Sequence, residues 1–149
     1  MTPKRLLLPF LIVGLVLSAP VHAADDAVES ALADHFAFES YSDGSVRPEQ
    51  ITPDLWEAMV IIDTRDAGQY EEDHIPGAKH IEWRRVLENQ AKIPEDKPVL
   101  LYCNTSSLSA QAGLALKLVG YDNIKILAGG FDAWKAKGGF EAYKSNQGE

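Results

Sequence analysis

The chain has a single cysteine, Cys103, among its 149 residues, so it cannot form an intramolecular disulfide. Basic residues are also scarce, with 14 Lys and Arg against 22 Asp and Glu and a net charge of −8. A chain this acidic is not expected to bind nucleic acid or an anionic lipid surface. Hydrophobic residues make up 46% of the sequence and charged residues 24%, which suits one globular domain.

The longest apolar run, Leu6–Leu17, is shorter than the roughly 20 residues that a membrane-spanning helix needs. Two basic residues precede it, and Val21 and Ala23 stand at the −3 and −1 positions of a cleavage site. Met1–Ala23 is therefore predicted to be a secretory signal peptide that is cleaved after Ala23, rather than an N-terminal membrane anchor. An alternative cleavage position follows the next residue, which is also alanine.

Cleavage would remove Lys4 and Arg5 and no acidic residue, which takes the net charge from −8 to −10. The protein is then expected to be periplasmic or secreted, with no membrane among its partners after cleavage. Export places it in an oxidising compartment, where disulfides are common. A lone exported thiol is either buried and inert or kept for chemistry, and the position of Cys103 favours chemistry.

Four segments follow from the composition along the chain. They are the signal peptide at 1–23, an acidic leader at 24–47, a domain at 48–140 and a polar tail at 141–149. In the leader, Val28, Leu32 and Phe36 are spaced as on a short amphipathic helix, which we expect to pack on the domain.

Short apolar segments alternate with helical patterns through the domain. Strands are predicted at Val60–Asp63, Lys79–Ile81, Val99–Tyr102 and Ile124–Leu127. Helices are predicted after Thr52, which can cap one beginning at Pro53, and over Ala67–Glu72, Trp83–Gln90, Ala110–Val119 and Phe131–Lys137. This alternation is typical of a three-layer α/β/α fold with a small, mainly parallel sheet of four to five strands.

The stretch around Cys103 has the order strand, cysteine, polar loop and helix. A cysteine just before a helix lies among unpaired backbone N–H groups and near the positive end of the helix dipole. That setting favours the thiolate, which is the nucleophilic form, and it also forms a cup for an anion. Asp63, Arg65 and the Gly129-Gly130 turn are predicted at the same edge of the sheet, because ligands of such sheets gather at the carboxyl ends of strands.

Several motifs in a fixed order resemble the rhodanese domain family in its single-domain, exported form. They are Ile61–Asp66, Tyr70 with His74–Ala78, Leu101–Cys103 and Leu127–Trp134. The resemblance implies a sulfurtransferase that needs no cofactor, in which Cys103 takes sulfane sulfur from a donor, becomes a persulfide and passes the sulfur to a thiophilic acceptor. It also implies a substrate-binding loop made of Asn104, Thr105, Ser106, Ser107, Leu108 and Ser109.

Partners are expected to be a small sulfur-containing substrate or a thiol or persulfide carrier, and the protein is expected to be a monomer. No metal is expected, because His35, His74 and His80 lack metal-ligand spacing with Cys103. His74 is interpreted as a hydrogen-bond donor that fixes its turn rather than as a base.

The loop departs from the family pattern at two positions. Ser106 stands where glycine is common and Leu108 where arginine is frequent, so no cation lies between Cys103 and Ser109. A dianionic donor such as thiosulfate loses direct charge pairing, and a neutral or thiol-bound persulfide is favoured. Related phosphatases place an arginine at the position of Ser109, so phosphatase activity is not expected.

Four charged residues are candidates for a supporting role. Arg84 and Arg85 would supply the cation that the loop lacks, unless they lie on a solvated surface. Asp63 and Arg65 would orient the loop or form a structural pair at the end of their strand, and the structural role is favoured. Two alternatives to the enzyme stay open: a non-catalytic rhodanese-fold binding module, and a persulfide carrier with one specific partner.

Overall fold

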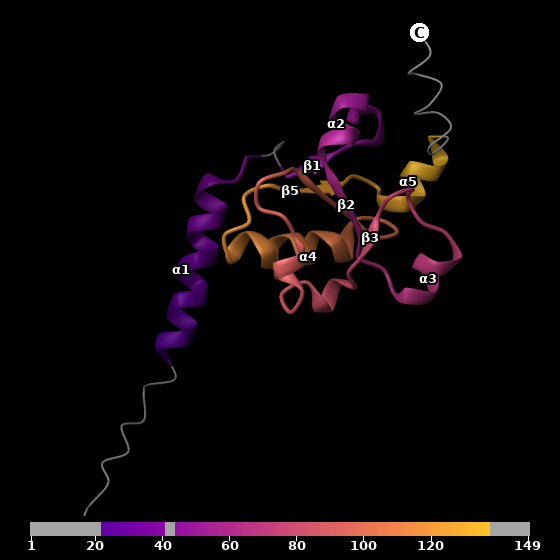
Figure 1. The fold of residues 1–149 in the computed structure, drawn as a ribbon. Coiled ribbons are helices and arrows are strands. Elements are labelled where there is room, and N and C mark those ends of the chain that lie inside the picture. The colour runs from indigo at the N-terminus through magenta and orange to yellow at the C-terminus, as the bar shows by residue number, and fades with distance from the viewer. Residues whose placement is uncertain (1–21, 41–43, 138–149) are drawn as a thin grey trace, which may run out of the picture.

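The structure is a computed structural model that describes residues 22–40 and 44–137 (Figure 1). Residues 1–21 of the predicted signal peptide and the predicted polar tail at 141–149 lie outside the described residues. Within the described ranges, no helix combines the length and the apolar character needed to cross a membrane.

Five parallel strands form one sheet in the order β1-β5-β4-β2-β3. Their bounds are Ser45–Val46 for β1, Val60–Asp63 for β2, Lys79–His80 for β3, Val99–Tyr102 for β4 and Ile124–Leu127 for β5. The predicted parallel α/β architecture is confirmed, and β2, β4 and β5 have the predicted bounds. The edge strand β1 lies in the predicted leader and was not expected from its two residues.

Side chains of the central strand β4 alternate between two apolar clusters, one on each face of the sheet. Val99 and Leu101 enter a cluster that α4 (Ser107–Leu118) covers with Ala112 and Leu116. Leu100 and Tyr102 enter a second cluster, which includes Ile51, Ile61, Ile75, Ala78, Leu127, Phe131 and Trp134. All four side chains of β4 are at most 1% exposed, which explains their unbroken apolar run.

The short helices begin at identifiable caps. The Thr52 hydroxyl accepts a hydrogen bond from Leu55 N–H at 3.3 Å at the start of α2 (Pro53–Ala58), as predicted. Asp66 accepts one from Gln69 N–H at 3.0 Å at the start of α3 (Ala67–Glu72). The helix α5 (Gly130–Ala136) follows β5 on the second face.

The helix predicted over Trp83–Gln90 is wrong. Two short 3₁₀ turns, Trp83–Arg85 and Gln90–Lys92, stand there instead. The Arg85 carbonyl accepts hydrogen bonds from Asn89 N–H at 3.1 Å and from the Asn89 side-chain amide at 2.8 Å, so a single helical hydrogen bond forms here without extending into a helix.

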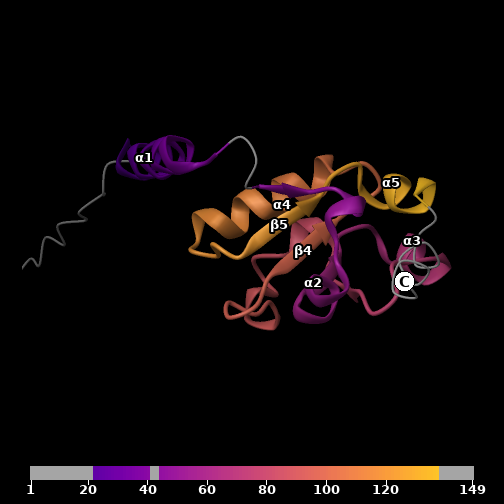
Figure 2. The same cartoon turned by 90° about the horizontal axis from the view of Figure 1, so that it is seen from above.

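The leader forms most of α1 (His22–Phe38), whose first two residues belong to the predicted signal peptide. This helix lies at the periphery of the fold in both views (Figure 1 and Figure 2). The helix is present as predicted, but its apolar stripe does not pack on the domain: Val28 is 59% and Phe36 is 66% exposed. Directly after α1, Glu39 forms an ion pair with Lys117 on α4, with nitrogen–oxygen distances of 2.8 and 2.9 Å. The helix spacing of the stripe was correct, and only its orientation differs.

Candidate active site

The parallel strands bring the predicted groups to one edge of the sheet. Asp63 ends β2, Cys103 follows β4, and Gly129 and Gly130 follow β5, the neighbour of β4. Thr64 links the ends of β2 and β4 there, because its N–H and its hydroxyl each donate to the Tyr102 carbonyl at 2.8 Å. Thr64 was not singled out from the sequence, where a threonine after a strand carries no distinctive signal.

Cys103 is a free thiol and its side chain is buried, with 2% exposure of the residue. Burial acts to raise the pKa of the thiol, but hydrogen bonds from Ser109 N–H, Thr105 N–H, the Ser109 hydroxyl and Leu108 N–H lower it overall. The Ser109 oxygen lies 3.7 Å from the Cys103 sulfur. All these donors are neutral groups of the predicted loop, so the thiolate is stabilised without a cation.

Ser106 shapes the loop in a conformation that favours glycine. Its φ of 87° lies in the left-handed region, and α4 begins at the next residue. The Ser106 hydroxyl donates to the Leu127 carbonyl at 2.8 Å, while its own carbonyl accepts from the Ser109 hydroxyl at 3.0 Å. The loop is thereby tied to the end of β5. Thr105, Ser107 and Leu108 are exposed beside the buried Ser109.

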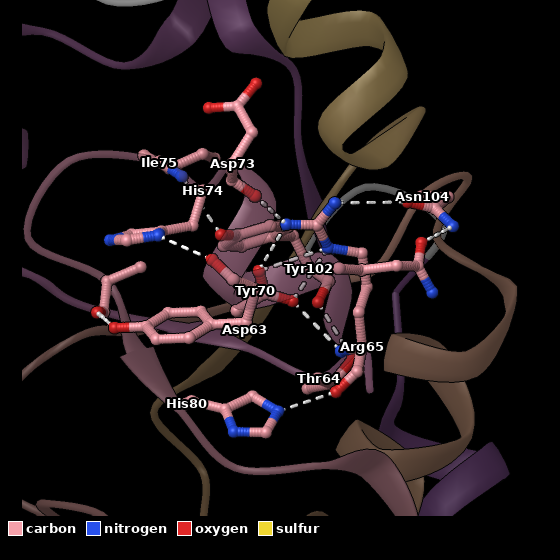
Figure 3. A network of polar contacts seen from close by, with 12 residues as sticks. Asp63, Thr64, Arg65, Tyr70, Asp73, His74, Ile75, His80, Tyr102 and Asn104 are labelled. Carbon is pink, nitrogen blue, oxygen red and sulfur yellow. Dashed lines mark hydrogen bonds and ion pairs between the residues drawn. The ribbon is translucent and has the colours of Figure 1, made fainter. Parts of the chain in front are cut away.

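Asp63 and Arg65 form a buried ion pair (Figure 3). The Arg65 side chain donates to both carboxylate oxygens, at 2.6 Å for the shortest contact, and to the Asp73 carbonyl at 2.6 Å. Burial acts to lower the pKa of Arg65, but the Asp63 carboxylate raises it overall. Arg65 also reaches Asn104 Oδ1 at 3.4 Å, so the pair touches the cysteine loop. Whether it orients the loop or only stabilises the end of β2 stays a prediction.

Asn104 connects this pair to α3. Its side-chain nitrogen donates to Gln69 Oε1 at 2.6 Å, and the Gln69 amide donates in turn to Asp66. Nothing in the residues around Gln69 predicted this contact across 35 residues.

The turn before β3 is fixed by aromatic and imidazole side chains. His74 Nδ1 lies 2.8 Å from the Tyr70 carbonyl, which agrees with a turn-fixing contact. The Tyr70 hydroxyl donates to the Ala78 carbonyl at 2.8 Å, and His80 Nε2 lies 2.7 Å from the Arg65 carbonyl (Figure 3). Burial, followed by the hydrogen bond to Asp63, raises the pKa of Tyr102 far above its ordinary value, so this hydroxyl stays protonated.

Arg84 and Arg85 are engaged by neighbouring carboxylates. Arg84 Nε lies 2.8 Å from Glu82, and Arg85 Nε lies 2.6 Å from Glu88. Their side chains are 69% and 63% exposed. Their role toward a substrate stays a prediction. In the part of the chain that the structure describes, no three His, Cys, Asp or Glu side chains cluster as ligands of a metal ion would.

Fold and site together define a parallel α/β domain with one acidified thiol in an amide-lined loop at the carboxyl edge of its sheet. The model of the rhodanese-like domain family matches residues 49–137. The chain therefore belongs to the rhodanese-like domain family, as its motifs predicted.

Two curated relatives carry the name thiosulfate sulfurtransferase GlpE. The protein from Coxiella burnetii is 38% identical over 78 residues, which cover 52% of this chain and 73% of the relative. The protein from Pseudomonas savastanoi is 30% identical over 91 residues, which cover 61% and 86%.

Solved structures agree on the fold. A rhodanese-related protein from Thermoplasma volcanium superposes with a TM-score of 0.59 at 22% identity, covering 64% of this chain and 94% of that one. The rhodanese-like domain of an Anabaena protein also gives 0.59, at 25% identity, covering 64% and 75%.

Proposed function

We propose that this protein is a sulfurtransferase that carries sulfane sulfur on Cys103. The observation that carries the proposal is the buried Cys103 thiol. Burial acts to raise its pKa, but hydrogen bonds from the loop amides and the Ser109 hydroxyl outweigh this effect and lower it overall. Membership of the rhodanese-like family and the two relatives named thiosulfate sulfurtransferase support the same reaction.

The reaction has two displacement steps. In the first, the Cys103 thiolate attacks the outer sulfur of the donor, a sulfur–sulfur bond forms on Cys103, and the donor's own sulfur–sulfur bond breaks. The leaving group keeps the electron pair and departs as a thiolate from a persulfide donor, or as sulfite from thiosulfate. In the second step, an acceptor thiolate or cyanide attacks the terminal sulfur and Cys103 leaves as a thiolate, so no external oxidant or reductant is needed.

The loop amides act on both steps. In the persulfide the negative charge moves to the outer sulfur, and the N–H groups that surround the thiolate offer donors to that charge. Each charge-assisted hydrogen bond of this kind contributes about 1.5–3 kcal/mol. His74, which is held against a backbone carbonyl, is not required as a base, because the thiolate is already favoured.

The donor is proposed to be a thiol persulfide in preference to thiosulfate. Residues Asn104–Ser109 include no Lys or Arg, and the charge of Arg65 is compensated by Asp63. A dianionic donor therefore meets only neutral hydrogen-bond donors in this loop. A neutral or singly charged persulfide can bind with these neutral hydrogen-bond donors and needs no cation.

We further propose that the chain acts in the periplasm or outside the cell, as a monomer, after cleavage behind Ala23. The apolar segment Leu6–Leu17 with its flanking residues supports this location. N-terminal sequencing of the protein recovered from the periplasmic fraction tests the cleavage site. An intact Met1 on the exported protein would refute it.

The decisive experiment is an intact mass measurement. Protein incubated with glutathione persulfide is expected to gain the mass of one sulfur atom, and the Cys103→Ser variant is expected to gain none. Thiosulfate is expected to load the protein more slowly. No adduct from either donor would refute the sulfurtransferase and leave the non-catalytic binding module.

Turnover separates the enzyme from the partner-specific carrier. A persulfide that forms on Cys103 but passes to neither cyanide nor small thiols would favour the carrier. The cation-free loop is the feature that supports this alternative to the enzyme. The double variant Arg84→Ala, Arg85→Ala tests the predicted cation, and an unchanged thiosulfate rate would remove both arginines from the substrate site.

A further inference from the structure

The first turn of α5 is bonded to the backbone of the cysteine loop. Phe131 N–H donates to the Cys103 carbonyl at 2.8 Å, and Asp132 N–H donates to the Asn104 carbonyl at 3.1 Å. The first N–H groups of a helix have no partner inside it. Here two of them bind the carbonyls of the nucleophile and of the residue that follows it.

These bonds fix the direction of two peptide units. A trans peptide is planar, so its C=O and its N–H point to opposite sides, and the described residues include no cis peptide. The carbonyl of the Asn104–Thr105 unit points to α5, and its Thr105 N–H therefore points away from α5. Burial acts to raise the pKa of Cys103, and the Thr105 N–H is one of the hydrogen-bond donors that outweigh burial and lower that pKa.

Gly130 is the residue that permits the approach. A Cβ built on it would lie 2.3 Å from the Cys103 carbonyl oxygen and 2.5 Å from that of Asn104, far inside contact distance. Its φ of +59° adds strain for any other residue. A side chain at this position must push α5 away from the loop or turn the two carbonyls.

We propose that the backbone of α5, admitted by Gly130, is a positioning device that aims the Thr105 N–H at the Cys103 sulfur. The backbone N–H groups around the Cys103 sulfur are then positioned jointly by the loop and by a helix that begins at Gly130, 27 residues after Cys103 (130 − 103). The proposal rests on the proposed function, since it explains how one of the N–H donors around the reactive sulfur of that transferase is positioned.

The test measures the acidity of the thiol directly, through the pH dependence of alkylation by iodoacetamide. Cys103 is the sole cysteine, so alkylation reports on it alone. Gly130→Ala is expected to raise the apparent pKa of Cys103, and a rise of about one unit lowers the thiolate fraction about tenfold at pH values well below the wild-type pKa. The matched control is Gly77→Ala, whose φ is +79° but whose Cβ would meet nothing within 4 Å.

A second pair of variants removes a single donor. Asp132→Pro deletes the N–H that binds the Asn104 carbonyl, in the first turn of α5 where this N–H has no partner inside the helix, and Asp132→Ala keeps it. The apparent pKa is expected to rise in Asp132→Pro and to stay unchanged in Asp132→Ala. If Gly130→Ala does not fold, this pair decides alone.

A wild-type pKa in folded Asp132→Pro would overturn the proposal, and so would an equal rise in Asp132→Ala or in Gly77→Ala. Alkylation needs no sulfur donor. A wild-type protein that takes up no sulfur, combined with the expected pKa pattern, would refute the proposed function while leaving the positioning role of α5 in place.

Discussion

The hydrogen bonds that lower the pKa of Cys103, against the effect of its burial, come from neutral groups. The loop that surrounds it offers three backbone N–H donors and one hydroxyl, and these outweigh the cost of burying a thiolate. The Ser109 hydroxyl lies near both the Cys103 sulfur, at 3.7 Å, and the Ser106 carbonyl, at 3.0 Å. A hydroxyl has one proton, so it serves these acceptors in turn.

Replacing Ser109 by alanine is expected to raise the pKa of Cys103. The rise is expected to be less than about one unit, because the Ser109 N–H remains as a donor. Ultraviolet absorbance of the thiolate as a function of pH measures it. Ser107→Ala, which removes an exposed hydroxyl from the same loop, is the control. An equal effect of both substitutions would refute a specific role for Ser109.

The lowered pKa of Cys103 also makes stability depend on pH. Although burial acts to raise it, the folded pKa lies below the unfolded one, so the thiolate stabilises the fold above the unfolded pKa. This contribution is lost as pH falls through the folded value. The difference in unfolding free energy between wild type and Cys103→Ser is expected to grow with pH across that window, as measured by urea denaturation. A difference that is constant with pH would contradict the lowered pKa.

Arg65 matters more for stability than for charge at the site, because it compensates the fully buried Asp63. Arg65→Met leaves that carboxylate without its partner and is expected to cost about 3–5 kcal/mol of unfolding free energy. Denaturant titration of Arg65→Met, Asp63→Asn and the double variant measures the coupling between them. Additive losses would show that the pair contributes nothing beyond its separate parts.

Among the elements, β4 and α4 carry the cysteine loop between them, so the seat of α4 on the sheet sets the loop. Gly113 lets the helix approach β5: a Cβ there would lie 2.8 Å from Ile126 Cδ1 and 3.4 Å from Ile124 Cγ2. Gly113→Leu is therefore expected to cost about 1–3 kcal/mol through overpacking. Thermal denaturation measures the loss, with Gln111→Leu on the exposed face of α4 as control. An unchanged melting temperature in Gly113→Leu would show that this contact is loose.

The central elements were predictable because burial leaves a clear pattern in the residues. Val99–Tyr102 is a run of four apolar residues since both of its faces are covered, and Cys103 follows it at the edge where ligands gather. Local capping was also readable, as Thr52 and Pro53 show. The apolar run and the helix cap can both be recognised from residues that are consecutive in the chain.

The errors concern features that depend on distant or competing contacts. Trp83, Val86 and Leu87 have the spacing of a helix, yet only short 3₁₀ turns form there and Leu87 is 42% exposed. The apolar stripe predicted the helix α1 correctly but not the face that it turns to solvent, and the ion pair between Glu39 and Lys117 lies outside that stripe. Hydrogen bonds between backbones, such as those from α5 to the loop, leave no trace in residue type except at Gly130.

For the whole molecule, the acidic excess acts on any charged substrate. A net charge of −8, or −10 without Lys4 and Arg5, creates a mean field that repels anions. The cysteine loop contains no Lys or Arg to reverse that field locally. The charge of the donor therefore affects the encounter with Cys103 as well as its binding.

Ionic strength is expected to separate the two classes of donor. Raising it from about 0.01 M to 0.15 M shortens the Debye length from about 30 Å to about 8 Å, which screens the repulsion of thiosulfate by the protein. kcat/KM with thiosulfate is expected to rise a few-fold over this range, while the value with a neutral alkyl persulfide stays constant. Stopped-flow measurement of sulfur loading on Cys103 gives both. A thiosulfate rate that falls with salt would mean that a cation, such as Arg84 or Arg85, reaches the site and dominates the local field.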